Sequence, residues 1–191
     1  MVVQPWRDVV TGFAVAGLCA LAYLLSFELM KWLPAWLEYA PGVALFFLPA
    51  GVKLVALLVA RAWGLVGIVA AGAWTAADVW QSADGMTLLG NVLVWVGIPY
   101  VVIHLMLRWM NIHADLSNLT YLRVLVICMA ATVASSVVGN VYAVWTHAQP
   151  LADLWARAAA MALGDFLGAG VLFALLIGGV NLVQAGRALD H

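Results

Sequence analysis

The chain has 191 residues, of which 66% are hydrophobic and 9% are charged, with a formal net charge of -1 and a mean hydropathy of +1.06. A soluble domain carries about a quarter charged residues, so this composition excludes one. No cluster of basic residues forms the stripe that binding to nucleic-acid phosphates requires, so we expect the lipid bilayer, and no nucleic acid, as a partner.

Six apolar windows predict six transmembrane helices, since each crossing needs about 20 apolar residues. In chain order they cover Val9 to Met30, Gly42 to Ala60, Trp63 to Trp80, Met86 to Trp109, Tyr121 to Trp145 and Ala156 to Val183. The runs are continuous and do not alternate, which favours helices over a membrane barrel. The sequence therefore predicts an all-α integral membrane protein, with residues 1–191 forming a single transmembrane domain.

The second predicted span is irregular. Pro49 lies in its outer half, Gly51 follows two residues later, and Lys53 is a charge inside the span. A proline inside a helix removes one backbone hydrogen bond, and freed backbone groups at membrane depth must be covered by protein or line a cavity. We therefore expect this span to be kinked or broken at Pro49.

The orientation follows from the Lys and Arg residues near the short loops, which concentrate on the cytoplasmic side of a membrane. If both termini are cytoplasmic, the inner side holds Arg7, Arg61, Arg108, Arg123 and Arg187, and the outer side holds Lys31 and Arg157. This bias predicts a multi-pass protein whose N-terminus and C-terminus are both cytoplasmic.

Two opposite charges lie at similar depths in different spans. At 1.5 Å per residue, Lys53 is about 16 Å and Asp165 about 13 Å from the outer ends of their spans. They can form an ion pair if the second and sixth spans are neighbours. Two interpretations remain open: the pair locks two helices together, or it forms the floor of an outward-facing ligand pocket between the second, third and sixth spans, with Asp78 nearby.

Small and amide side chains complete the candidate site. Gly164 and Gly168 allow another helix to approach closely, and Asn91 is expected to form a hydrogen bond across helices. The residues predicted for a ligand site or a buried ion pair are thus Pro49, Gly51, Lys53, Asp78, Asn91, Gly164, Asp165 and Gly168. The chain contains no catalytic motif and no His or Cys spacing typical of a metal site, so we expect no enzyme, no catalytic residue, no metal and no cofactor.

Three strings carry a family resemblance: LPAGVKLVALLVARAWGLVGIVAAG (48–72), GNVLVWVGIPYVVIHLMLRW (90–109) and MALGDFLGAGVLFALL (161–176). Their Pro-x-Gly element, the glycine-rich span after an arginine and an aromatic residue, and the Gly-Asp-x-x-Gly helix resemble the first class of bacterial membrane-associated sensor domains. The resemblance implies a sensory input module in the bacterial inner membrane, which works with histidine-kinase or cyclic-dinucleotide output domains.

The chain departs from this family in several places. It has Leu48-Pro49-Ala50 where Pro-Pro or Trp-Pro is common, it has Trp63-Gly64-Leu65 where Trp-Pro-Gly is common, and Lys53 interrupts a usually apolar stretch. It carries no output domain, so we expect either an excised input domain or a stand-alone relative that acts through a signalling partner or as a homodimer.

The leading hypothesis is therefore a sensory or ligand-binding module for a small molecule that the sequence does not identify. The alternative is a small-molecule transporter subunit, similar in size and number of spans to the substrate-binding subunits of energy-coupling-factor transporters. Such a subunit would use the irregular second span as a half-helix binding site.

Overall fold

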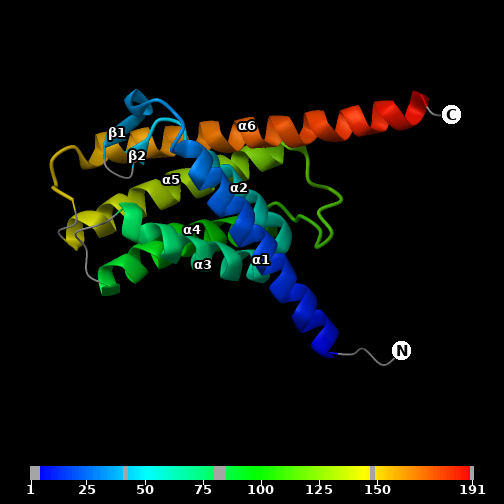
Figure 1. Ribbon diagram of the computed structural model, residues 1–191, viewed down its shortest axis with the longest axis horizontal. Coiled ribbons are helices and arrows are strands. Elements are labelled where there is room, and N and C mark those ends of the chain that lie inside the picture. Colours follow the sequence, from blue (N-terminus) through cyan, green and yellow to red (C-terminus); the bar gives the residue numbers. More distant parts are fainter. Residues whose placement is uncertain (1–4, 41–42, 80–84, 147–148, 190–191) are drawn as a thin grey trace.

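The computed structural model describes residues 5–40, 43–79, 85–146 and 149–189. The helices are α1 (Pro5–Met30), α2 (Leu48–Val55), the π-helical turn η2 (Ala56–Ala60), α3 (Arg61–Val79), α4 (Gly85–Trp109), α5 (Tyr121–Trp145) and α6 (Leu154–Leu189). A 3₁₀ turn (Ala35–Leu37) and two short antiparallel strands, β1 (Glu38–Ala40) and β2 (Val43–Ala44), precede α2. Figure 1 shows the strands at one end of a helix bundle, and both termini and the α4–α5 loop at the other.

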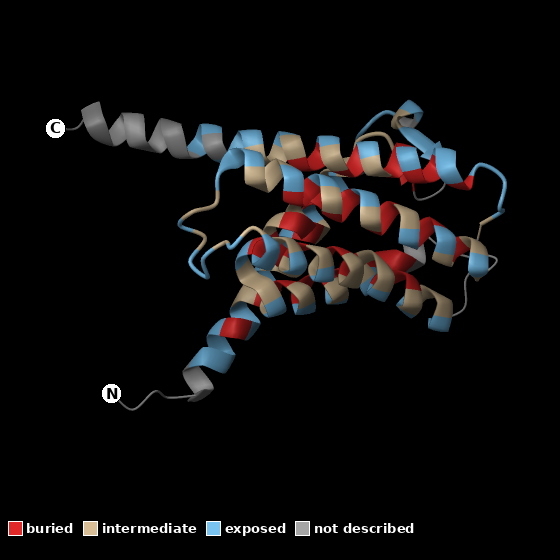
Figure 2. Cartoon of the chain, turned by 180° about the vertical axis from the view of Figure 1, so that it is seen from behind, coloured by how far each residue is buried: buried red, intermediate tan, exposed pale blue. Residues whose placement is uncertain are grey.

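The surface of the bundle is apolar and its interior contains polar side chains, the reverse of a soluble protein. Large aliphatic residues are exposed on every long helix, such as Leu21 on α1, Leu105 on α4 and Leu175 on α6. Buried polar or charged residues include Ser26, Lys53, Thr75, Asn91, Thr132, Ser135, Ser136, Asn140, Arg157 and Asp165. Figure 2 shows buried positions facing the centre of the bundle along most helices. This distribution fits a chain whose solvent is the hydrocarbon of a bilayer.

Exposed tryptophans mark the two ends of the bundle. Trp32 and Trp36 follow α1, Trp145 ends α5, and Trp109 ends α4 at the opposite end, and each is at least 74% exposed. Tryptophan prefers the headgroup level because its ring is amphipathic. The positions of these residues are consistent with a membrane that covers the bundle between them.

Among the described residues, five helical segments are long and apolar enough to cross a membrane: Asp8–Met30, Leu48–Ala76, Gly85–Trp109, Tyr121–Trp145 and Leu154–Leu176. The all-helical membrane character agrees with the sequence analysis, but the predicted number of six is not matched. The difference arises because most of the second and most of the third predicted span lie within the single segment Leu48–Ala76.

The geometry within this segment explains the difference. The helical part before Arg61 comprises only the eight residues of α2 and the five of η2, about 20 Å at 1.5 Å per residue, which is too short to span a bilayer core as a helix. At Arg61 the backbone adopts φ 50°, and a Cβ on Gly64 would overlap the carbonyl of Ala56. Residues eight apart in a straight helix are about 12 Å apart, so the chain folds back on itself here.

Pro49 starts a helix and does not kink one. It occupies the first turn of α2, where its missing N–H is not needed by an intrahelical hydrogen bond. The irregular part of the second predicted span therefore lies before Pro49, in the segment 43–47, which contains β2 and enters the bundle without helical structure. We call this segment the extended entry segment.

The extended entry segment packs on the glycine side of α6. The Phe47 N–H donates to the carbonyl of Gly164 at 3.0 Å, and a Cβ on Gly164 would overlap the carbonyl of Ala44. A Cβ on Gly168 would overlap the carbonyl of Phe47. The expectation that another helix approaches these glycines was incomplete. The non-helical backbone of the extended entry segment contacts them, and α2, which follows it in the chain, packs on the next part of α6.

Alanine substitutions should distinguish the effect of this backbone contact on stability from the effect of helix propensity. We expect Gly164→Ala and Gly168→Ala to lower the unfolding temperature, because each added methyl group displaces the extended entry segment. Gly170→Ala is the matched control on the same helix, since nothing lies within 4 Å of its Cβ position. It should stabilise the helix by up to about 1 kcal/mol. Equal effects of all three substitutions, measured by thermal unfolding in detergent, would contradict the contact.

Candidate functional site

A buried pair of opposite charges lies where α2 meets α6. Lys53 Nζ is 3.6 Å from Asp165 Oδ2, and the two side chains are 6% and 2% exposed. The separation is longer than a hydrogen bond, and Asp165 Oδ2 has no hydrogen-bond partner among the described residues. The two residues therefore form an ion pair whose charges are neutralised without tight hydrogen bonding.

Three helices enclose this ion pair. Besides α2 and α6, α1 contributes Tyr23, which is 7% exposed and lies within electrostatic range of Asp165. On α2, Gly51 lies two residues before Lys53, and its Cβ position is 3.0 Å from the Cα of Ala169. The close helix contact therefore adjoins the ion pair and excludes lipid from it.

The structure brings together six of the eight predicted site residues. They are Pro49, Gly51 and Lys53 at the start of α2 and Gly164, Asp165 and Gly168 on α6. Asp78 lies in the last turn of α3, and its side chain lies outside the described residues. Asn91 lies on α4, which packs against α3 and α5, so it belongs to a different contact.

Asn91 does not form the hydrogen bond that the sequence predicted for it. The residue is 2% exposed, and neither its amide nitrogen nor its oxygen has a hydrogen-bond partner within the described part of the chain. A buried amide without a hydrogen-bond partner lowers the free energy of unfolding, because no group in the folded protein replaces its hydrogen bonds to water.

The cavity that the structure forms is not the one that the sequence predicted. Ala50 and Ala169, which flank the ion pair, are 0% and 1% exposed, so the region between α2 and α6 is filled. A small cavity lies instead at the strand end of the bundle, between β2, α4, α5 and α6. It holds about 10 Å³, roughly the room of one water molecule.

A line of buried polar residues on α5 leads to this cavity, and the sequence had indicated only Asn140 among them, as a residue that forms hydrogen bonds across helices. Thr132, Ser135, Ser136 and Asn140 recur every three to four residues and are at most 5% exposed. Most bond to their own helix backbone, as Ser135 Oγ does to the Thr132 carbonyl at 3.2 Å. Asn140 Nδ2 also reaches Met161 Sδ on α6, at 3.5 Å. The helical spacing of these residues was the available signal.

Arg157 is the other residue that the sequence analysis placed differently. It was expected near the outer loop, but its side chain is 5% exposed and lines the cavity. Its guanidinium donates to the carbonyls of Ala152 and Pro150 in the loop before α6. The side chain thus folds back to hold the end of the α5–α6 connection.

No protein-family model matches the chain, and neither a curated protein nor a solved structure is significantly similar to it. Its chemistry is therefore argued from its own residues. Within the described ranges, no group of three or more His, Cys, Asp or Glu side chains is placed to hold a metal ion.

A double-mutant cycle should measure the coupling between Lys53 and Asp165. We expect Lys53→Met or Asp165→Asn alone to destabilise the protein by about 3–5 kcal/mol, because each leaves the other residue as a buried charge without an opposite charge. The double variant should lose about 0.5–3 kcal/mol less than the sum of the single losses.

The exposed pair Glu28–Lys31 is the matched control, with Nζ 2.7 Å from Oε1 and side chains 60% and 49% exposed. The cycle of Glu28→Gln and Lys31→Met should give a coupling of at most about 1 kcal/mol. Strictly additive losses for Lys53 and Asp165, measured by reversible unfolding in detergent, would show that their charges do not interact.

Proposed function

We propose that the chain is an integral membrane sensory or ligand-binding module, centred on the contact between the extended entry segment, α2 and α6. The observation that carries this proposal is the buried Lys53–Asp165 ion pair, whose lysine lies on the helix that directly follows a non-helical stretch of backbone. Non-helical backbone and ionisable groups are both costly at membrane depth, and both mark functional regions in membrane proteins.

The same contact supplies an element with two states. Docked on α6, the extended entry segment satisfies the Phe47 N–H through Gly164 and holds α2 so that Lys53 faces Asp165. A ligand that binds the undocked state more tightly shifts the population toward it. Because α2 continues through η2 to the turn at Arg61, movement of α2 is transmitted to the other end of the bundle.

The proposed topology has six crossings of a bacterial inner membrane, with both termini on the cytoplasmic side. The extended entry segment, α2 and η2 together form the second crossing, and α3 forms the third. Arg61 supports this arrangement, because its Nη2 donates to the carbonyl of Ala114 in the α4–α5 loop at 2.7 Å. Both termini lie at that same end in Figure 1, as an even number of crossings requires.

Reporter fusions test this topology. A fusion after Gly85 should report the outside of the membrane, and fusions after Ala114 and after His191 should report the inside. If the fusion after Gly85 reads inside and the one after His191 reads outside while a tag at the N-terminus also reads inside, the number of crossings is odd and the hairpin at Arg61 does not separate two spans.

Native mass spectrometry tests ligand binding. We expect protein purified in a mild detergent to retain a small molecule, and the Lys53→Met/Asp165→Asn double variant to lose it while remaining folded. The Glu28→Gln/Lys31→Met double variant is the control and should retain it. Retention by all three proteins would place the ligand away from the ion pair, and a mass equal to that of the bare chain would contradict a stably bound ligand.

The second candidate function is a small-molecule transporter subunit. The observation that favours it is the half-helical second crossing, because many transporters bind substrate at such discontinuous helices. A transporter subunit should release its retained molecule across a liposome membrane only when an ATPase and a coupling subunit are reconstituted with it. A sensory module should change its contacts with a signalling partner and move no molecule.

A further inference from the structure

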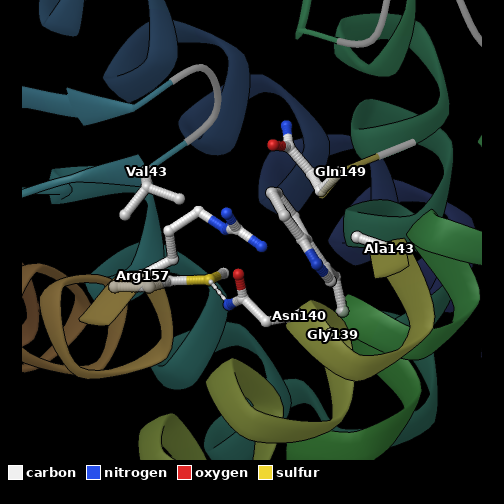
Figure 3. A pocket seen from close by; sticks show the side chains of 8 residues that line it. Val43, Gly139, Asn140, Ala143, Gln149 and Arg157 are labelled. Atoms are coloured by element: carbon white, nitrogen blue, oxygen red, sulfur yellow. Dashed lines mark hydrogen bonds between the residues drawn. The ribbon is translucent and has the colours of Figure 1, made fainter. Parts of the chain in front are cut away.

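The cavity at the strand end of the bundle surrounds a guanidinium group. Figure 3 shows Arg157 extending from α6 into this space, with Asn140 and Gln149 on other sides of it and Val43 beyond. The Gln149 N–H donates to the carbonyl of Ala143 at 3.1 Å, which anchors the loop against the end of α5. The walls are therefore built from four separate elements and fixed by backbone contacts.

Among the described residues, the side chain of Arg157 forms hydrogen bonds only with neutral groups. Two of its nitrogens donate to the neutral carbonyls of Ala152 and Pro150, whereas Nε is buried without a hydrogen-bond partner. The ion pairs formed by residues 5–40, 43–79, 85–146 and 149–189 do not include Arg157. Buried guanidinium groups in proteins are normally paired with an acid, so this one lacks its usual partner.

The helix that carries Arg157 adds potential of the same sign. Arg157 is the fourth residue of α6, and the first turn of this helix contains no acidic residue. The N-terminal end of a helix carries a partial positive charge, which disfavours a cation and favours an anion. Both the side chain and the helix therefore attract a negative group to the same place.

We propose that this cavity is an anion site, which receives one carboxylate or phosphate oxygen of a ligand at the outer end of the bundle. Arg157 supplies the charge and its free Nε–H, and the amide of Gln149 supplies a second donor from the loop. A cavity of about 10 Å³ admits one such oxygen, so the remainder of the ligand stays outside. A soluble anion and the phosphate of a lipid headgroup share this chemistry.

The site is separate from the Lys53–Asp165 ion pair, so it stands or falls independently of the sensory role proposed above. Gln149→Glu provides the sharpest variant, because it places a carboxylate in the lining of the same cavity without removing any group that Arg157 now contacts. This internal anion should occupy the site in place of an external one.

The experiment measures thermal unfolding at pH 7 in a neutral detergent at a fixed background of sodium chloride, with acetamide as the uncharged counterpart of acetate. We expect added acetate or inorganic phosphate to raise the unfolding temperature of the unmodified chain saturably, since ligands that bind only the folded state stabilise it. Before acetate or phosphate is added, Gln149→Glu should have a higher unfolding temperature than the unmodified chain, and it should show no further rise when they are added.

Nanodiscs distinguish the source of the anion. If the natural ligand is a lipid, phosphatidylglycerol nanodiscs should raise the unfolding temperature over phosphatidylcholine nanodiscs for the unmodified chain and not for Gln149→Glu. If the ligand is a soluble anion, the rise should appear with acetate or phosphate in both membranes. Either result supports the site.

A second arginine provides the matched control. Arg123 is half-buried at the opposite end of the bundle, and its Nη1 donates to the carbonyl of Asn118 at 2.9 Å. Arg123→Gln should keep the full anion response, whereas Arg157→Gln should lose it and Arg157→Lys should retain part of it. The proposal is overturned if the unmodified chain responds to none of the probes, or if Gln149→Glu responds as strongly as the unmodified chain.

Discussion

The arrangement of this protein depends on a backbone contact between the extended entry segment and the glycine side of α6. Non-helical backbone at membrane depth has no water with which to form hydrogen bonds. The contact gives the Phe47 N–H a partner in the Gly164 carbonyl, and the absent side chains of Gly164 and Gly168 leave room for the chain. Non-helical backbone is tolerated here because the glycine side of α6 covers it.

The position of the charge pair follows from this contact. Asp165 follows Gly164 directly, so it is turned by about 100° around α6 from the glycine that receives the extended chain. Lys53 is on the second turn of α2, which begins immediately after that chain ends. Fixing Phe47 against Gly164 therefore also fixes Lys53 beside Asp165, and the Pro-x-Gly and Gly-Asp-x-x-Gly elements form one structural unit.

The sequence predicted the long helices well because a bilayer sets their length. The expected span Tyr121 to Trp145 coincides with α5, and the expected end of the fourth span, Trp109, is the end of α4. Hydropathy could not reveal the extended entry segment, since Val-Ala-Leu-Phe-Phe is equally apolar in a strand or a helix. The fold-back at Arg61, by contrast, falls between the second and third predicted spans, because this charged residue interrupts the apolar run.

The candidate site was predictable only in part, for a related reason. Similar depth was enough to suggest Lys53 with Asp165, because an unpaired charge in hydrocarbon needs a partner. The contact between their two helices is filled at Ala50 and Ala169, because Gly51 lets the backbones come close together. The pocket expected between the second, third and sixth spans stays a prediction. Arg157 was counted with the outer side at the start of the sixth span, and nothing local in the sequence shows that its side chain folds back under the loop.

Depth also explains why Lys53 has an acidic partner within the protein, whereas Arg157 forms no ion pair with a described residue. Lys53 lies between the ends of the bundle, where α1, α2 and α6 exclude lipid and solvent, so its charge has to be balanced by the protein's own Asp165. Arg157 lies in the first turn of α6, beside a loop and the exposed Trp155 that suits the headgroup level. The charge of a cation at that level can be balanced by an anion from outside the protein, so Arg157 does not need an acidic partner within the chain.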